Sequence, residues 1–297
     1  MKSNLTIKRG AVRTAPVGPA GLAGRILAGA VALLLIWGVL GGRAWAITGG
    51  EVDEANAYPN IGAIVIALPG YEPFVGASGT LIHPRVLLTA GHVTQFMLKV
   101  RPETIPYTYV SFGTYALDPT TWTNEIEAVI THPNYWNPAH FANDVGVIIL
   151  KQPIAGVPLA KMPDAGLLDY LNEPKALRLP GQGGVPFRVV GYGGGLTRNP
   201  PVATFPGDGW RRFGDSEFLN VLPGWLLLQQ NFSTGNDGAG YGDSGGPVFW
   251  VQPDGTRVMV GITSWGDVNC VAMNFYWRAD IPATLDFISS VVQGLEQ

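Results

Sequence analysis

Short runs of Val, Ile and Leu recur along the chain, separated by many of its 40 glycines and 24 prolines. Val86-Leu87-Leu88 and Val145–Leu150 are two such runs, and each is too short for a typical helix. Apolar runs of this length between turn-forming residues are typical of β-strands. The pattern therefore predicts an all-β protein with many turns.

A longer apolar segment, Ile26–Leu40, follows a basic stretch near the N-terminus and precedes Ala44-Trp45-Ala46. A membrane-spanning helix needs about 20 apolar residues. The order basic, apolar, small is instead typical of a secretory signal peptide. We expect residues 1–46 to be a signal peptide cleaved after Ala46, with an uncleaved membrane anchor as the alternative. Cleavage would give a secreted or periplasmic protein that meets the membrane only during export.

Composition narrows the class of protein further. The formal net charge is −3 and basic residues do not cluster, so nothing favours binding to nucleic acid. Charged residues make up only 14% of the chain, which also has nine tryptophans, and this favours a compact protein over a disordered one. The roughly 250 residues left after the expected cleavage are enough for two sizeable cores.

The stretch Gly242-Asp243-Ser244-Gly245-Gly246-Pro247 has the residues of a nucleophile loop. A serine hydroxyl becomes a good nucleophile only when a base removes its proton, and acyl transfer also needs donors aimed at the developing oxyanion. Glycines beside Ser244 permit a sharp turn and leave room for an arriving carbonyl group. The alternative is an ordinary glycine-rich turn, because all these residue types form turns.

The base that Ser244 needs must be one of four histidines. His92 follows an apolar, strand-like run whose last residues are small. These small residues leave room for the imidazole. Asp144 opens the run Val145–Leu150, where a charge is costly unless it has a hydrogen-bonding partner. His92 and Asp144 are therefore the candidates for base and orienting carboxylate. The other histidines, His83, His132 and His140, are interpreted as surface or loop residues.

The order His92, Asp144, Ser244, with the residues around each, resembles the trypsin/chymotrypsin family of serine endopeptidases. Subtilisin-like enzymes and α/β-hydrolases place the same residue types in other orders. The resemblance covers roughly residues 47–297. Its shorter matches are Ile47–Gly50, Ser78–Ile82, His132–Tyr135, Gly191–Gly193 and Ser264–Gly266.

The fold implied by this resemblance is all-β, with two packed six-stranded antiparallel β-barrels and a C-terminal helix. The expected parts are a first barrel in residues 47–150, a connection in 151–186, and a second barrel with the terminal helix in 187–297. A short helix is expected near Asp164–Glu173. The terminal helix is expected at Asp286–Leu295, packed on the second barrel, and the active site in the cleft between the barrels.

Family members cleave a polypeptide substrate through an acyl-enzyme and need no metal or cofactor. In the implied site, the N–H groups of Gly242 and Ser244 form the oxyanion hole. Ser264 is expected to hydrogen-bond Asp144, and the backbone of Ser264–Gly266 to pair with the substrate as an added strand. The substrate-binding residues implied are Gly238, Tyr241, Ser264, Trp265, Gly266 and Asn274. We expect the protein to be a monomer.

The expected cleavage site has a chemical consequence. Cutting after Ala46 makes Ile47 the new N-terminus. In the family, the freed α-ammonium pairs with the aspartate before the nucleophile, here Asp243, and holds the oxyanion loop in its working shape. The export cut would thus activate the enzyme directly, without a separate propeptide.

Cysteine usage departs from the family, whose exported members generally carry several disulfides. The only cysteine, Cys270, cannot form an intramolecular bridge. We interpret it as a small buried hydrophobe, with an intermolecular bridge or a reactive thiol as the alternative. The lack of disulfides favours a bacterial secreted enzyme. Leu196–Asp208, which holds three prolines, is expected to be a surface loop or a plain connector.

In members of the family, the residue six positions before the nucleophile forms the floor of the specificity pocket, and the resemblance assigns this place to Gly238. A trypsin-like preference for Lys or Arg would need an acid there, and a one-residue shift would bring in Asp237. Asn274 stands where the family usually has glycine, so its amide would narrow the specificity pocket or make it polar. We therefore expect no trypsin-like cleavage.

Two other functions remain open. The chain is either an enzyme or a catalytically silent homologue that acts as a secreted binding module, although no catalytic side chain is missing. The same machinery would also serve an esterase or another acyl transferase.

Overall fold

The structure is a computed structural model of the chain. It describes residues 47–123, 125–135, 142–173, 177, 187–194, 196–198, 201–203 and 207–296. The expected signal peptide, residues 1–46, and His140 lie outside this part. Over the described ranges, no helix combines the length and the apolar character needed to cross a membrane.

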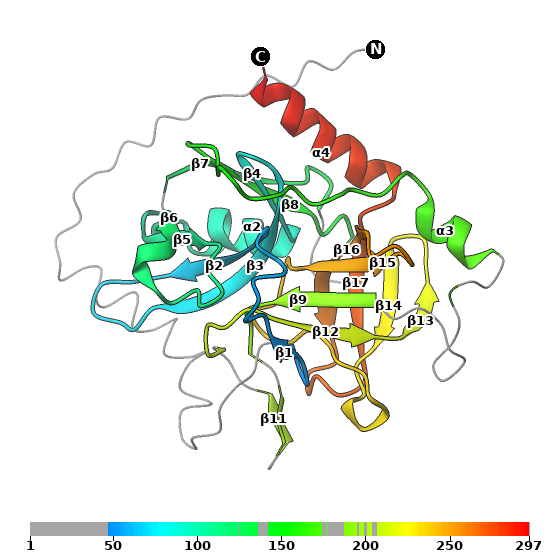
Figure 1. Cartoon of the computed structure of the whole chain (residues 1–297). Helices are drawn as coiled ribbons and strands as arrows, with labels where there is room; N and C mark the ends of the chain where they lie inside the picture. The colour runs from blue at the N-terminus through cyan, green and yellow to red at the C-terminus, as the bar shows by residue number, and fades with distance from the viewer. Residues whose placement is uncertain are drawn as a thin grey trace. The chain divides into compact units, whose positions relative to one another are not determined.

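The first of two main sheets is antiparallel throughout and has seven strands (Figure 1). In spatial order they are β6 (Trp122–Thr123), β5 (Thr108–Ser111), β2 (Ile61–Ile66), β3 (Phe74–His83), β4 (Val86–Thr89), β8 (Gly146–Leu150) and β7 (Ile126–Thr131). β6 and β7 form opposite edges, yet only two residues separate Thr123 from Ile126 in the chain. The two edges must therefore come together, so the sheet curls into a barrel.

The second main sheet has eight antiparallel strands. In spatial order they are β1 (Glu51–Val52), β12 (Arg212–Ser216), β9 (Phe187–Gly191), β15 (Pro247–Val251), β16 (Arg257–Gly266), β17 (Met273–Arg278), β14 (Trp225–Gln229) and β13 (Phe218–Val221). Glu217 alone separates β12 from β13, although they lie toward opposite edges. This sheet is therefore also curled.

The predicted fold of two barrels with a C-terminal helix is confirmed, and the seven and eight strands arise because two expected strands are each divided and one edge strand is added. Each barrel was expected to have six strands. β6 with β7, and β12 with β13, are each the two parts of one sharply bent stretch of chain, which is split into two short strands. β1 adds a further edge strand to the second sheet.

The N-terminal segment also differs from the expected first barrel. Its strand β1 pairs with β12 of the second sheet, at Glu51 opposite Phe213 and Val52 opposite Arg212. Ile47 is fully buried in the core of the second sheet. Burial of this apolar side chain, together with the β1 pairing, draws the segment away from the barrel that it precedes in sequence.

The helices are short except for the last. They are α2 (Gly91–Gln95), α3 (Leu167–Asn172) and α4 (Pro282–Leu295). Single-turn helical segments occur at Phe96–Val100, Pro102–Tyr107, Pro119–Thr121 and Phe232–Thr234. α3 lies within the range expected for a short helix, whereas α4 begins earlier than expected, because Pro282 suits the first turn of a helix.

α4 packs against both sheets and not only the second. The indole of Trp277 in β17 donates a hydrogen bond to Thr284 over 2.9 Å. On the other side, the ring of Phe287 lies 5.0 Å from the ring of His132, which follows β7. His132 is thus buried beside the helix in the loop that follows β7, so the interpretation as a loop residue holds and that as a surface residue does not.

Between Arg198 and Pro201 the chain turns back on itself. β10 (Leu196–Arg198) and β11 (Pro201–Ala203) pair as an antiparallel hairpin, where the sequence predicted a loop or connector. Pro201 is the first residue of β11, a position where proline costs little.

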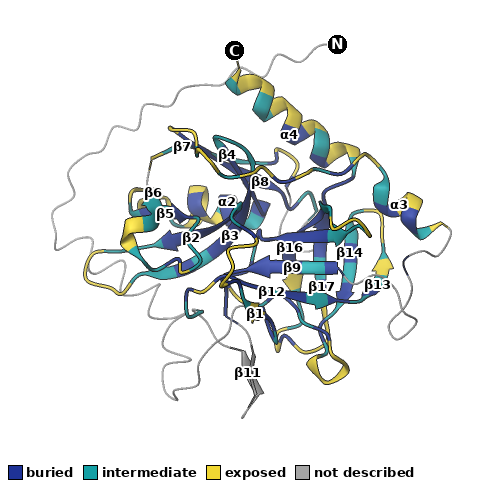
Figure 2. Cartoon of the chain, viewed as in Figure 1, coloured by how far each residue is buried: buried dark blue, intermediate teal, exposed yellow. Residues whose placement is uncertain are grey.

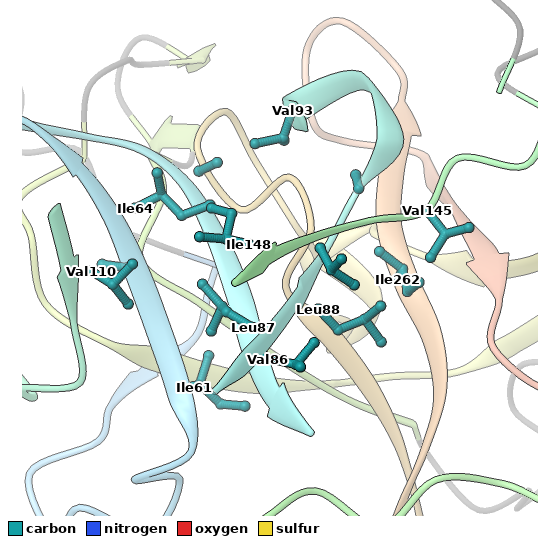
Figure 3. Close-up of a cluster of buried hydrophobic side chains, with 14 of the residues drawn as sticks. Ile61, Ile64, Val86, Leu87, Leu88, Val93, Val110, Val145, Ile148 and Ile262 are labelled. Atoms are coloured by element: carbon teal, nitrogen blue, oxygen red, sulfur yellow. The ribbon is translucent and has the colours of Figure 1, made fainter. Parts of the chain in front are cut away.

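One hydrophobic core runs through both sheets. Ile61, Leu87 and Ile148 from the first sheet belong to the same cluster as Met259 and Ile262 from the second (Figure 3). Figure 2 shows buried residues along the central strands of each sheet and exposed residues along the outer face of α4. The two barrels therefore share apolar contacts across their junction and fold as interdependent halves.

A buried ion pair ties the N-terminal segment to this junction. Nε of Arg211 lies 2.8 Å from Oδ2 of Asp53, and both side chains have no exposed surface. Arg211 also donates to the carbonyl oxygens of Ile61 and Phe112 and to the hydroxyl of Tyr192. A buried charge with this many partners is stable only while all of them are present.

We expect Asp53→Ala to lower the free energy of unfolding by about 3–5 kcal/mol, because it leaves the Arg211 guanidinium buried without a carboxylate. Urea titration of the purified protein measures this. Glu127→Ala removes the acid from the exposed Arg85–Glu127 pair and serves as the control. Its expected effect is below about 1 kcal/mol. Equal effects of the two substitutions would contradict a special role for the buried pair.

Candidate active site

The end of β4 and the start of β8 bring His92 and Asp144 together. Thr89 pairs with Gly146 across these antiparallel strands, so the residues just beyond them meet. His92 lies in the first turn of α2, and Asp144 is fully buried. Nδ1 of the imidazole is 2.9 Å from Oδ2 of Asp144, and the His92 N–H donates to Oδ1 over 2.7 Å.

The second sheet supplies a further partner for Asp144. The hydroxyl of Ser264 in β16 donates to Oδ2 of Asp144, so the expected hydrogen bond between them is present. Because a carboxylate only accepts, the proton of a neutral His92 ring lies on Nδ1, and Nε2 carries the lone pair that can accept a proton. Asp144 therefore fixes both the orientation and the tautomer of the imidazole.

Ser78 of β3 holds the nucleophile loop from the first sheet. Its N–H donates to the carbonyl of Ser244 over 2.9 Å, and its hydroxyl donates to the carbonyl of Gly242 over 3.1 Å. Its oxygen in turn accepts from the N–H of Tyr192 over 3.2 Å. Ser78 lies in the matching segment Ser78–Ile82, yet nothing in the sequence indicates this role, because the partners are more than 100 residues away.

Gly245 shows how close this loop lies to His92. Its φ is +83°, and a Cβ there would be 2.5 Å from the carbonyl oxygen of Ser78 and 2.8 Å from the N of Ala90. Ala90 is two residues before His92. On the other side, the Gly245 N–H donates to the carbonyl of Thr263, the neighbour of Ser264, over 2.8 Å. The structure thus brings Ser244, His92 and Asp144 to one junction between the sheets.

The backbone of the loop leaves two donors available. Gly242 has a φ of +96°, which favours glycine. Across the described residues, neither the Gly242 N–H nor the Ser244 N–H donates to a protein acceptor. Both N–H groups are therefore available to stabilise an oxyanion.

Asp243 points away from the junction into the protein and is fully buried. Oδ1 accepts from the N–H of Gly193 over 2.8 Å, while Oδ2 accepts from Gly240 over 2.8 Å and from Ile47 over 3.3 Å. Burial raises the pKa of Asp243 to about 6, and these three donors only partly oppose the shift. The partners of this buried carboxylate are thus three main-chain N–H groups.

The expected substrate-binding residues fall into a buried and an exposed group. Gly238 and Asn274 are buried in contact with each other, whereas the side chains of Tyr241 and Trp265 are exposed. The ring of Trp265 stacks on Phe275 at 3.8 Å between centroids.

The side chain of Asp237 is directed at β12 and not at the space around Gly238. Its Oδ2 accepts from the N–H of Asp215 in β12 over 3.1 Å, and its side chain contacts Gly214. Burial raises its pKa. The shifted register that would bring this acid into the specificity pocket is therefore wrong.

Gln230 was missed by the sequence reasoning. Its side chain is fully buried and packs against Gly238, close to Asn274. No sequence motif includes Gln230, which directly follows β14, and its contact with Gly238 depends on how the chain folds.

Cys270 behaves as a buried residue. Its side chain is buried, and burial raises the pKa of its thiol to about 12, so the thiol is neutral at physiological pH. This agrees with its interpretation as a small buried hydrophobe and disfavours a reactive thiolate.

These features together define a serine protease of the two-barrel type. A family model for trypsin matches residues 47–201, more than half of the chain, and the chain therefore belongs to the trypsin family. A curated relative, named "Trypsin, alkaline C", from Manduca sexta is 26% identical over 235 residues, which cover 77% of this chain and 84% of that protein.

We expect Gly245→Ala to reduce kcat/KM by at least about 100-fold, because a displaced loop misplaces Ser244. Its added Cβ overlaps backbone atoms that cannot move aside. Gly255→Ala is the matched control, since Gly255 has a φ of +84° and open space around it. The control has only the conformational cost of about 1–2 kcal/mol and keeps its activity. Peptide hydrolysis and thermal unfolding of both variants decide between crowding and backbone strain.

Proposed function

We propose that this protein is a secreted serine endopeptidase that uses His92, Asp144 and Ser244. One observation carries the proposal: a buried carboxylate lies 2.9 Å from an imidazole beside which a glycine-bounded serine loop is held. A charge buried at this position is costly without a function or a partner. An imidazole oriented in this way is suited to accept a proton from a serine hydroxyl.

In the proposed reaction, Oγ of Ser244 attacks the carbonyl carbon of a peptide bond while Nε2 of His92 takes the hydroxyl proton. The negative charge that develops on the carbonyl oxygen is stabilised by the N–H groups of Gly242 and Ser244. His92 then gives its proton to the leaving amine, and an acyl-enzyme remains on Ser244. A water molecule then attacks the acyl carbonyl while His92 takes its proton. His92 returns this proton to Oγ of Ser244, and the carboxylic acid product is released. Each step moves a proton through side chains of this chain alone.

Asp144 supports the cation that His92 becomes between these steps. The carboxylate is fully buried, so its interaction with the imidazolium is screened little by solvent. In the proposed complex, an extended substrate pairs as an added strand with the backbone of Ser264–Gly266, at the end of β16.

The proposal includes activation at the Ala46–Ile47 bond by the export cut. Ile47 has a φ of +46°, which is strained for a β-branched residue, and its N–H already faces Asp243. Cutting the bond removes this restriction on φ and converts the N–H into an ammonium. The new charge would then neutralise the buried carboxylate of Asp243.

Ser244→Ala should lower peptide hydrolysis by at least about a thousandfold with no change in thermal unfolding, because only the nucleophile is lost. A fluorophosphonate probe should label the native protein at Ser244 and not the variant. Ser233→Ala, an exposed serine on a surface turn, is the control and should retain both activity and labelling.

A native protein that neither hydrolyses peptides nor reacts with the probe would be the catalytically silent homologue. Hydrolysis of esters without hydrolysis of amides would make it an esterase. Both outcomes overturn the endopeptidase proposal.

We expect a chain that begins at Ile47 to be at least about tenfold more active than one that begins at Ala46. In the longer chain, the ammonium is displaced from Asp243, and an unpaired buried carboxylate costs several kcal/mol. N-terminal sequencing of the exported protein should likewise find Ile47. Another start, or equal activity of the two chains, contradicts activation by the export cut.

The same pair predicts a pH dependence. Pairing with Asp243 raises the pKa of the Ile47 ammonium above the ordinary α-amino value of about 7.7–8.0. A raised folded-state pKa means that the stabilisation is present at neutral pH and is lost as the pH rises through that pKa. The activity of the Ile47 chain should therefore fall in alkaline solution. An unchanged rate up to pH values of about 11 would argue against the pair.

A further inference from the structure

The space around Gly238 is occupied by two amide side chains from neighbouring strands. The proposed reaction holds the scissile carbonyl at Ser244 with the substrate strand along Ser264–Gly266. The side chain before the cleaved bond then enters the space between that strand and the segment 238–240. What fills this space decides which substrates fit.

Asn274 is fixed at both ends of its amide. It lies in β17 opposite Gly266 of β16 and is almost completely buried. Oδ1 accepts from the N–H of Ala239 over 2.9 Å, and Nδ2 donates to the carbonyl of Ala239 over 3.2 Å. The hydroxyl of Tyr276 donates to Oδ1 over 3.3 Å. An amide held by three hydrogen bonds does not swing aside without losing them.

The amide of Asn274 lies between Gly238 in the segment 238–240 and Gly266 at the end of β16, and contacts both. A Cβ on Gly238 would lie 2.7 Å from Oδ1 of Asn274, and a Cβ on Gly266 would overlap its Nδ2. Both glycines are therefore in direct contact with the same side chain. Little depth remains between the walls for a long substrate side chain.

Gln230 fills the space on the other side of Gly238. It is fully buried, and its Nε2 donates to the carbonyl of Ala239 over 2.6 Å. A Cβ on Gly238 would overlap its Cγ. The floor beneath Gly238 is thus a second neutral amide.

The nearby acids do not supply a charge to this floor. Asp237 faces β12, and the carboxylate of Asp243 is bound by Gly193, Gly240 and Ile47. A Lys or Arg side chain entering here would lose its hydration without gaining an ion pair.

We propose that Asn274 and Gln230 together close the specificity site, so that the enzyme cleaves after small uncharged residues such as Ala. This inference rests on the proposed endopeptidase function. Gln230 and Asn274 are specificity-determining residues in it, and neither contacts the reacting atoms.

The test is kcat/KM for a series of peptide p-nitroanilides that differ only in the residue before the cleaved bond. The native enzyme should prefer Ala over Phe and Lys by at least about tenfold, since a pocket rejects excess volume by about 1–3 kcal/mol. Asn274→Gly removes the amide and should raise kcat/KM for Phe at least about tenfold, while the rate for Ala changes little. Asn220→Gly makes the same change on an exposed strand residue and should leave the profile unchanged.

A native preference for Lys, Arg or Phe, or an unchanged profile in a folded Asn274→Gly variant, would overturn the inference and leave the endopeptidase function intact. A lack of hydrolysis for every substrate, with no fluorophosphonate labelling of Ser244, would overturn the proposed function instead. If Asn274→Gly does not fold, Asn274→Ala takes its place, and the native profile alone still decides the preference for small residues.

Discussion

The carboxylate of Asp144 has no exposed surface, and this constraint organises the molecule. A buried charge needs several hydrogen bonds, and the donors come from both sheets. His92 contributes its N–H and its ring from the start of α2, while Ser264 contributes its hydroxyl from β16. The carboxylate is therefore fully satisfied only when the two barrels dock. Docking of the barrels and orientation of the imidazole are two results of one interaction.

A second constraint acts on the backbone of the nucleophile loop. Gly242 and Gly245 both have positive φ values, and the loop is bonded to Ser78 from one sheet and to Thr263 from the other. Most of the loop's fixed contacts use main-chain atoms, so its shape does not depend on flexible side chains. In the proposed reaction, the N–H groups of Gly242 and Ser244 would therefore act from a backbone that other contacts already hold in place.

The described part of the chain holds no disulfide, and its stability comes from a continuous core and buried polar pairs. The pair between Arg211 and Asp53 joins the N-terminal segment to the barrel junction. Arg278 forms a similar link, because it contacts both Asp280 and Asp169 and so joins β17 to α3. These pairs fix segments of the kind that disulfides fix in small secreted proteins.

The sequence by itself determined the fold class and the residues of the candidate triad. Short apolar runs between turns predict strands, and glycines around Ser244 predict a sharp turn, because both signals depend only on neighbouring residues. It did not determine the direction of Asp237, the role of Ser78, the burial of His132 or the contact of Gln230 with Gly238. Nor did it place β1 in the second sheet. Each of these depends on partners that are distant in sequence, and only the packing of the folded barrels decides which of them meet.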